Sequence, residues 1–137
     1  MVVRTLPEYE DVSVIGKILA FHRTGNENGA MGSTILPREV LIVLTIIMIA
    51  AVLVFVFLQK EKSVWLLSGV CLIVAGGIGN LIDRIATGVV IDFIKVIYFP
   101  WIFNVADICV CVGAVLLCIA ILLMPDTKRG EEDGGDI

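Results

Sequence analysis

Three long apolar runs constrain this chain more than any other feature of its sequence. They cover residues 40–59, 63–82 and 101–124, and the one charged residue within them is Asp107. Each run is close to the roughly 20 residues that an α-helix needs to cross about 30 Å of hydrocarbon. The sequence therefore predicts a membrane protein, mainly α-helical, with three transmembrane helices in this chain.

The composition supports a membrane protein and narrows the range of functions. Of the 137 residues, 58% are hydrophobic and 18% are charged, whereas a soluble domain usually has about 45–50% apolar and about 25% charged residues. The net charge of −4 comes mostly from residues 126–137, and no basic patch indicates binding to nucleic acid. The four cysteines lie in apolar runs, so we expect them to pack as small side chains rather than to form disulfides.

The chain divides into three regions. Residues 1–37 are polar, with short β-like segments followed by a turn-rich stretch. Residues 38–125 are predicted to form a transmembrane helical bundle, and residues 126–137 a disordered acidic tail. The charged turn "QKEK" makes the first two spans an antiparallel hairpin. Between the second and third spans, Tyr98 and Trp101 suit the membrane interface.

Polar side chains gather where the second span ends and the third begins. Because consecutive spans run in opposite directions, these two ends lie on the same side of the membrane. The groups concerned are Asn80, Asp83, Arg84, Asp92, Asn104 and Asp107. We therefore expect a polar cluster at one membrane level, on the side opposite the lysines of "QKEK".

The second and third spans also concentrate small and polar residues on one helical face each. At about 100° per residue, one arc of the second span holds Gly69, Gly76, Asn80 and Asp83, with Arg84 at its border. The corresponding face of the third span holds Asn104, Asp107, Cys111, Ala114 and Cys118. We expect the small residues to let helices approach closely and the polar groups to face the bundle.

Carboxylates at membrane depth cost about 2.5–3.5 kcal/mol each on insertion scales, so they favour a functional interpretation. For Asp83 and Arg84, an ion pair that holds helices together is an equally good interpretation. Lys95 could pair with Asp92, but Asp107 has no basic residue in its span. Two carboxylates without dedicated cations at one level indicate a pair that shares a proton.

A pair of this kind can hydrolyse an amide. Like charges close together cannot both ionise, so one carboxyl holds a proton while the other acts as a base on water. The acid can then protonate the carbonyl oxygen or the leaving amine. Serine or cysteine catalysis would need a base partner that this face lacks. Metal catalysis competes poorly because His22 is the only histidine, so we expect neither a metal nor another cofactor.

Three blocks of sequence resemble a known family. "GGIGNLIDR" at residues 76–84, "GVVIDF" at 88–93 and "FNVAD" at 103–107 are similar, in order and spacing, to the signature blocks of bacterial lipoprotein signal peptidase, signal peptidase II. The resemblance covers residues 31–124 well and the N-terminal region loosely. Three linked blocks are far more specific than any one of them.

The resemblance implies a fold, an activity and a set of site residues. Asp92 and Asp107 would be the catalytic aspartates of an intramembrane aspartic endopeptidase. Asn80, Arg84 and Asn104 would hold the substrate and order the aspartates, and Asp83 would be a supporting partner. The family removes signal peptides from diacylglyceryl-modified prolipoproteins, so the implied partners are these substrates and membrane lipid. The implied location is the bacterial cytoplasmic membrane, with the site near its extracytoplasmic face.

The chain departs from the family pattern in two ways. The family has four spans and an extracytoplasmic β-like cradle, whereas this chain has three spans. We therefore expect a first span to be missing and residues 1–37 to be extracytoplasmic, with residues 12–35 forming the cradle. This expectation also explains the distribution of basic residues between the two sides of the membrane, because four lie in "QKEK" and the tail and six lie elsewhere. The family's cradle turn reads Asn-x-Gly-Ala, but Glu27 stands in place of the asparagine before Gly29 and Ala30, so no substrate role is carried onto that turn.

Two other functions remain open at the level of sequence. Buried acids also serve as proton relays, so a small proton-coupled transporter is one alternative. It would carry its acids near the middle of the spans and would have broken helices. The other alternative is a catalytically inactive, truncated membrane scaffold in which the polar groups only lock helices together.

Overall fold

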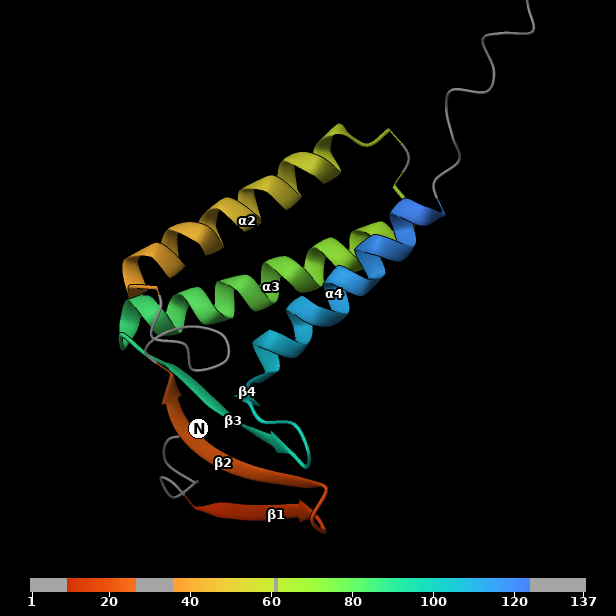
Figure 1. The fold of residues 1–137 in the computed structure, drawn as a ribbon. Coiled ribbons are helices and arrows are strands. Elements are labelled where there is room, and N and C mark those ends of the chain that lie inside the picture. The colour runs from red at the N-terminus through yellow and green to blue at the C-terminus, as the bar shows by residue number, and fades with distance from the viewer. Residues whose placement is uncertain (1–9, 27–35, 61, 124–137) are drawn as a thin grey trace, which may run out of the picture.

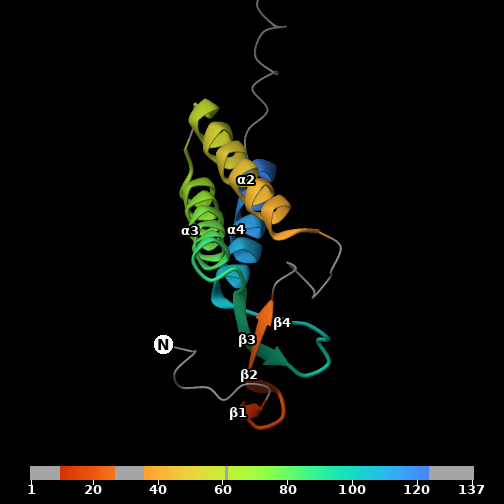
Figure 2. The same cartoon turned by 90° about the vertical axis from the view of Figure 1, so that its left-hand side faces the viewer.

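The structure is a computed structural model that describes residues 10–26, 36–60 and 62–123. Within these ranges the helices are α2 (Arg38–Leu58), α3 (Val64–Ala86) and α4 (Val105–Leu122). All three are long and apolar enough to cross a membrane, which confirms the predicted number of spans. The helices lie alongside one another in Figures 1 and 2, with the strands beneath them.

The described part of the chain forms two strands before the first two helices and two strands after them. β1 (Asp11–Ile15) and β2 (Leu19–Asn26) precede α2, whereas β3 (Val90–Val96) and β4 (Ile102–Phe103) lie between α3 and α4. All four form one antiparallel sheet in the order β1-β2-β3-β4. The β-like character expected before residue 37 is confirmed for β1 and β2, and the turn around Gly29 lies outside the described residues.

The helix ends that carry the polar groups differ from the predicted span ends. α3 continues to Ala86, so Asn80, Asp83 and Arg84 are all helical. α4 begins at Val105 rather than at residue 101. The reason is that residues 102 and 103 pair with β3 and that the side chain of Asn104 caps the helix. The polar block "FNVAD" thus contains a strand end, a cap and the first helical turn.

Close packing of α3 on α4 depends on glycine. A Cβ atom added at Gly69 would lie 2.9 Å from the carbonyl oxygen of Gly113, and one added at Gly113 would lie 2.7 Å from that of Gly69. A Cβ atom at Gly76 would collide with the carbonyl oxygen of Ala106. The expectation that glycines of the second span let a helix approach is therefore confirmed for Gly69 and Gly76.

The face of α4 that meets α3 is not the predicted one. Its buried residues are Gly113 and Ala120, whereas Cys111, Ala114 and Cys118 are exposed. Gly113 is the only glycine of α4, and seating it against Gly69 turns the Cys111 side of the helix away from α3. The small residues on that side therefore do not form the helix interface.

A charge cluster on the sheet joins β1, β2 and β3. Asp11 accepts a hydrogen bond of 2.7 Å from Nζ of Lys95, and Nδ1 of His22 lies 2.6 Å from its other oxygen. These two contacts hold the pKa of Asp11 below its usual value, and the contact with Lys95 has the larger effect. Lys95 follows Asp92 by three residues on β3, so its side chain projects from the opposite face of the strand. The pairing of Lys95 with Asp92 considered from the sequence is therefore replaced by a pairing with Asp11.

Candidate active site

Asp92 projects from β3 into the protein and is 3% exposed. Its strand is held in place by antiparallel pairing with β2, in which Asp92 lies opposite Thr24. One carboxylate oxygen, Oδ1, accepts a hydrogen bond of 2.8 Å from the side-chain amide of Asn104. A carboxylate from the sheet is thereby tied to the residue that caps α4.

Asp107 lies in the first turn of α4 and is fixed by a capping box. Its backbone N–H donates to Oδ1 of Asn104 at 3.1 Å, and its Oδ2 accepts from the backbone N–H of Asn104 at 3.1 Å. This reciprocal arrangement satisfies two donors that a helix N-terminus otherwise leaves open. The remaining oxygen, Oδ1, accepts a hydrogen bond of 2.8 Å from Nδ2 of Asn80 on α3.

The side-chain amides of Asn104 and Asn80 together connect the two carboxylates. Nδ2 of Asn104 donates both to Oδ1 of Asp92 and, at 3.0 Å, to Oδ1 of Asn80. Oδ1 of Asn104 accepts from the backbone N–H of Asp107. A reversed amide would set its oxygen against the Asp92 carboxylate and its N–H₂ against the backbone N–H of Asp107. The partners therefore allow one orientation of the Asn104 amide.

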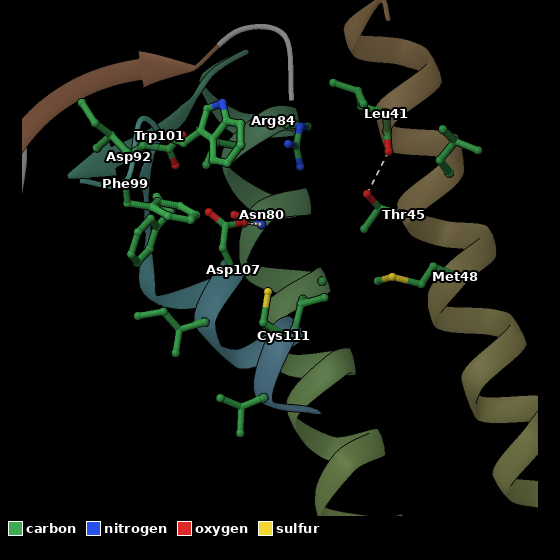
Figure 3. Close-up of a pocket in the computed structure, with 18 residues that line it drawn as sticks. Leu41, Thr45, Met48, Asn80, Arg84, Asp92, Phe99, Trp101, Asp107 and Cys111 are labelled. Carbon is green, nitrogen blue, oxygen red and sulfur yellow. Dashed lines mark hydrogen bonds between the residues drawn. The ribbon is translucent and has the colours of Figure 1, made fainter. Parts of the chain in front are cut away.

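A cavity of about 770 Å³ opens beside this network, between α2 and the α3–α4 pair. Asn80, Arg84, Asp92 and Asp107 contribute its polar lining. Figure 3 shows these residues on one side of the space, and Leu41, Thr45 and Met48 facing them from α2. Much of the remaining lining is apolar: Leu44, Val90, Ile102, Ile108, Val110 and Val112. The two carboxylates thus lie at the polar end of a largely apolar cavity.

Arg84 and Asp83 occupy different environments although they are neighbours. Arg84 lines the cavity and is 9% exposed, and its Nε finds no hydrogen-bond acceptor among the described residues. Asp83 is half-buried and does not line the cavity. Neither takes part in an ion pair in the part of the chain that the structure describes. The ion pair that the sequence left open for them is therefore not formed, and Asp83 does not join the network.

Aromatic side chains close one end of the cavity, and sequence reasoning gave them no place in the site. Phe99 packs edge to face against Trp101 and Phe103, with ring centroids 5.1 and 5.8 Å apart. All three line the cavity. Their spacing of two residues, typical of one face of an extended chain, is the signal that could have shown this. On α2, the helical spacing of Leu41, Thr45 and Met48 is the corresponding signal.

The described residues contain no group of three or more metal-ligating side chains. His22 lies on the sheet against Asp11 and does not line the cavity.

Comparison with known proteins decides the family. The family model described as "Signal peptidase (SPase) II" matches residues 1–123. The chain belongs to the signal peptidase II family. The lipoprotein signal peptidase of Clostridium acetobutylicum is 32% identical, and the match covers 92% of this chain and 84% of that protein. The one from Chlorobium luteolum is 35% identical, with 91% of this chain and 82% of that protein covered.

Solved structures give the same result for the fold. A bacterial membrane enzyme solved at 2.3 Å by the in meso method superposes with a TM-score of 0.80 at 30% identity. The match covers 98% of this chain and 83% of that chain. The three helices and the antiparallel sheet are therefore an arrangement that this chain shares with a bacterial membrane enzyme, and the resemblance seen in the three sequence blocks is confirmed.

Proposed function

We propose that this chain is an intramembrane aspartic endopeptidase that removes signal peptides from diacylglyceryl-modified prolipoproteins. Membership of the signal peptidase II family and the names of the relatives support cleavage of lipoprotein signal peptides. The observation that carries the aspartic mechanism is the pair Asp92 and Asp107, which line one cavity and whose carboxylates are joined through the side-chain amides of Asn104 and Asn80.

The hydrogen bonds leave each carboxylate able to act. Asn104 donates a hydrogen bond to Oδ1 of Asp92, and the carboxylate of Asp92 can act as the base that takes a proton from an attacking water. Each carboxylate oxygen of Asp107 accepts one hydrogen bond, which orients the side chain, and each oxygen keeps a second lone pair. With one proton shared by the pair, one carboxyl activates water while the other protonates the amide that is cleaved. No cofactor is needed for these steps.

The rest of the cavity supports a lipid-modified peptide as the substrate. Its apolar walls suit acyl chains and an apolar signal peptide, and the unmet donor of Arg84 suits a carbonyl oxygen. Asn80 and Asn104 hold the aspartates and thereby order them for the reaction. Asp83 remains a proposed supporting residue only through the family resemblance.

The proposal includes a location. The three apolar helices make the chain a multi-pass membrane protein. We propose that it lies in the bacterial cytoplasmic membrane with Asp92, Asp107 and the sheet near the extracytoplasmic face. Labelling of an engineered cysteine in β2 by a membrane-impermeant reagent, in intact cells, tests this side.

The two alternatives receive less support. Asp107 lies in the first turn of α4 and Asp92 lies on a strand, whereas a proton relay would carry acids near the middle of its spans. A scaffold would need its polar groups only to join helices, but these groups line a cavity.

The test replaces each aspartate by asparagine and follows cleavage of a diacylglyceryl prolipoprotein by the purified protein in lipid. General acid–base catalysis contributes about 10²–10⁴-fold, so Asp92→Asn and Asp107→Asn should each lose at least about 10²-fold in rate. Asp11→Asn is a matched control, because it makes the same change outside the cavity and should remain active. Normal cleavage by both site variants would contradict the proposal.

A further inference from the structure

The cavity beside the two aspartates contains a thiol. Cys111 follows Asp107 by four residues on α4, so it lies one turn further along the same face of the helix. It lines the cavity and is a free, exposed cysteine. Figure 3 shows its sulfur directed toward the end of the cavity where Asp107 lies. None of the mechanistic steps proposed above uses this side chain.

A second observation indicates that the same cavity receives a ligand. Arg84 is about nine-tenths buried, lines the cavity, and has an Nε with no acceptor among the described residues. A buried donor without a partner costs about 1–3 kcal/mol, so an incoming molecule with an acceptor oxygen is stabilised there. The apolar walls of the cavity include Leu44, Met48 and Ile108. The cavity therefore suits small molecules that combine an apolar body with carbonyl oxygens.

We infer that Cys111 is a covalent modification site within the catalytic cavity, open to small apolar electrophiles of the maleimide class. Modification of this thiol fills the space between α4 and α2 and blocks access to Asp107. The loss of peptidase activity rests on the proposed function, whereas the modification itself rests only on the cavity.

The reaction is a conjugate addition that balances without an oxidant. The thiol of Cys111 loses its proton to water, and the thiolate is the nucleophile. Its sulfur forms a bond to one alkene carbon of the maleimide, and the carbon–carbon π bond breaks. The electron pair passes to the carbon next to the second carbonyl group, and that carbon takes a proton from water.

The chain supplies its own matched controls. Cys118 lies on the same face of α4, two turns beyond Cys111, and is exposed but does not line the cavity. Cys109 faces α3, where its Cβ lies 3.1 Å from the position of a Cβ added at Gly76. Cys71 is exposed on α3 and is also absent from the cavity lining. A thiol inside the cavity can thus be compared with a thiol on the same face of α4 outside it.

The experiment uses two single-cysteine forms of the full chain in lipid nanodiscs, one retaining Cys111 and the other retaining Cys118. Each is treated with N-ethylmaleimide, and the adduct is measured by intact mass and the activity by prolipoprotein cleavage. We expect the Cys111 form to gain one adduct and to lose activity in proportion to it. The Cys118 form should keep its activity whether or not an adduct forms. An adduct on Cys111 without loss of activity would overturn the inference.

A variant that narrows the cavity separates this inference from the proposed function. Met48→Trp adds bulk to the cavity wall that α2 contributes, beside Gly77 of α3. It should slow adduct formation at Cys111 but not at Cys118, a readout that needs no peptidase activity. If the untreated protein cleaves nothing while this difference in rate persists, the proposed function fails and the modification site stands. Equal slowing of both thiols, or no adduct at Cys111 when Cys118 is modified, would overturn the site itself.

Discussion

Asn104 donates a hydrogen bond from its side-chain amide to Oδ1 of Asp92 at 2.8 Å, and the oxygen of the same amide caps α4. One side chain therefore performs two separable tasks. As a helix cap it stabilises the first turn that carries Asp107, and as a donor it orients the carboxylate that projects from β3. The two aspartates are brought together by chain segments that are joined by the pairing of β3 with β4 and by this residue.

Replacement of Asn104 by serine should separate these tasks. Serine caps helices about as well as asparagine, but it has no amide to reach Asp92 and Asn80. We expect Asn104→Ser to unfold at a temperature close to that of the wild type and to cleave prolipoprotein about 10- to 100-fold more slowly, as after loss of a group that orients a catalytic residue. Asn104→Ala should lose both functions, with about 1 kcal/mol less stability. Equal cleavage rates for Asn104→Ser and the wild type would contradict the orienting role.

Arg84 should lower the stability of the folded protein and strengthen its binding of substrate. Its Nε is buried without an acceptor, so replacement by methionine, which is apolar and of similar length, removes an unsatisfied donor. We expect Arg84→Met to unfold at the same or a higher temperature than the wild type in the absence of substrate. Loss of a hydrogen bond from a charged group costs about 1.5–3 kcal/mol, so KM should rise about 10- to 100-fold with a smaller change in kcat. Arg84→Lys, which keeps the charge, controls for electrostatics.

The polar composition of the site could be predicted from the sequence because its groups are costly in a membrane. Asn80, Asn104 and Asp107 are polar residues near the ends of apolar runs, Asp92 lies in the segment between two runs, and the structure joins these four by hydrogen bonds. The opposite directions of two consecutive spans were sufficient to bring their ends together.

Other features of the site could not be predicted because they depend on contacts between distant segments. The rotation of α4 is set by Gly113 against Gly69, and the periodicity of α4 alone does not reveal this contact. The pairing of β3 with β2 joins segments about seventy residues apart, such as Phe21 and Ile94. Asp83 lies within the predicted polar arc but outside the cavity. Neighbouring residues on a helix point about 100° apart, so the cavity is lined by Arg84 and not by Asp83.

The contact between Gly69 and Gly113 should be sensitive to a single methyl group. A Cβ atom at Gly69 meets backbone atoms of the facing helix, 2.8 Å from the nitrogen of Leu117, and backbone cannot rotate away as a side chain can. We expect Gly69→Ala to destabilise the protein by about 1–3 kcal/mol, measured by thermal unfolding in detergent. Gly79→Ala on the same helix is the control, since its Cβ would lie 3.3 Å from a side-chain atom of Ala106. An unfolding temperature for Gly69→Ala at or above that of Gly79→Ala would contradict this packing.

The cluster of Asp11, His22 and Lys95 should make the sheet sensitive to acid. Hydrogen bonds from Lys95 and His22 lower the pKa of Asp11 from its usual value of 3.8. A carboxyl whose pKa is lower in the folded state stabilises that state above its unfolded pKa, and the contribution disappears as the pH falls through the folded pKa. The stability difference between the wild type and Asp11→Asn should therefore be full at neutral pH and should shrink as the pH falls into the acid range, through the lowered pKa of Asp11. The effect should be small because the contacts are exposed and screened by salt. Hydrogen exchange of the β1 and β2 amides, followed over this pH range, checks it, and a difference that grows as the pH falls would show that Asp11 is not held by these partners.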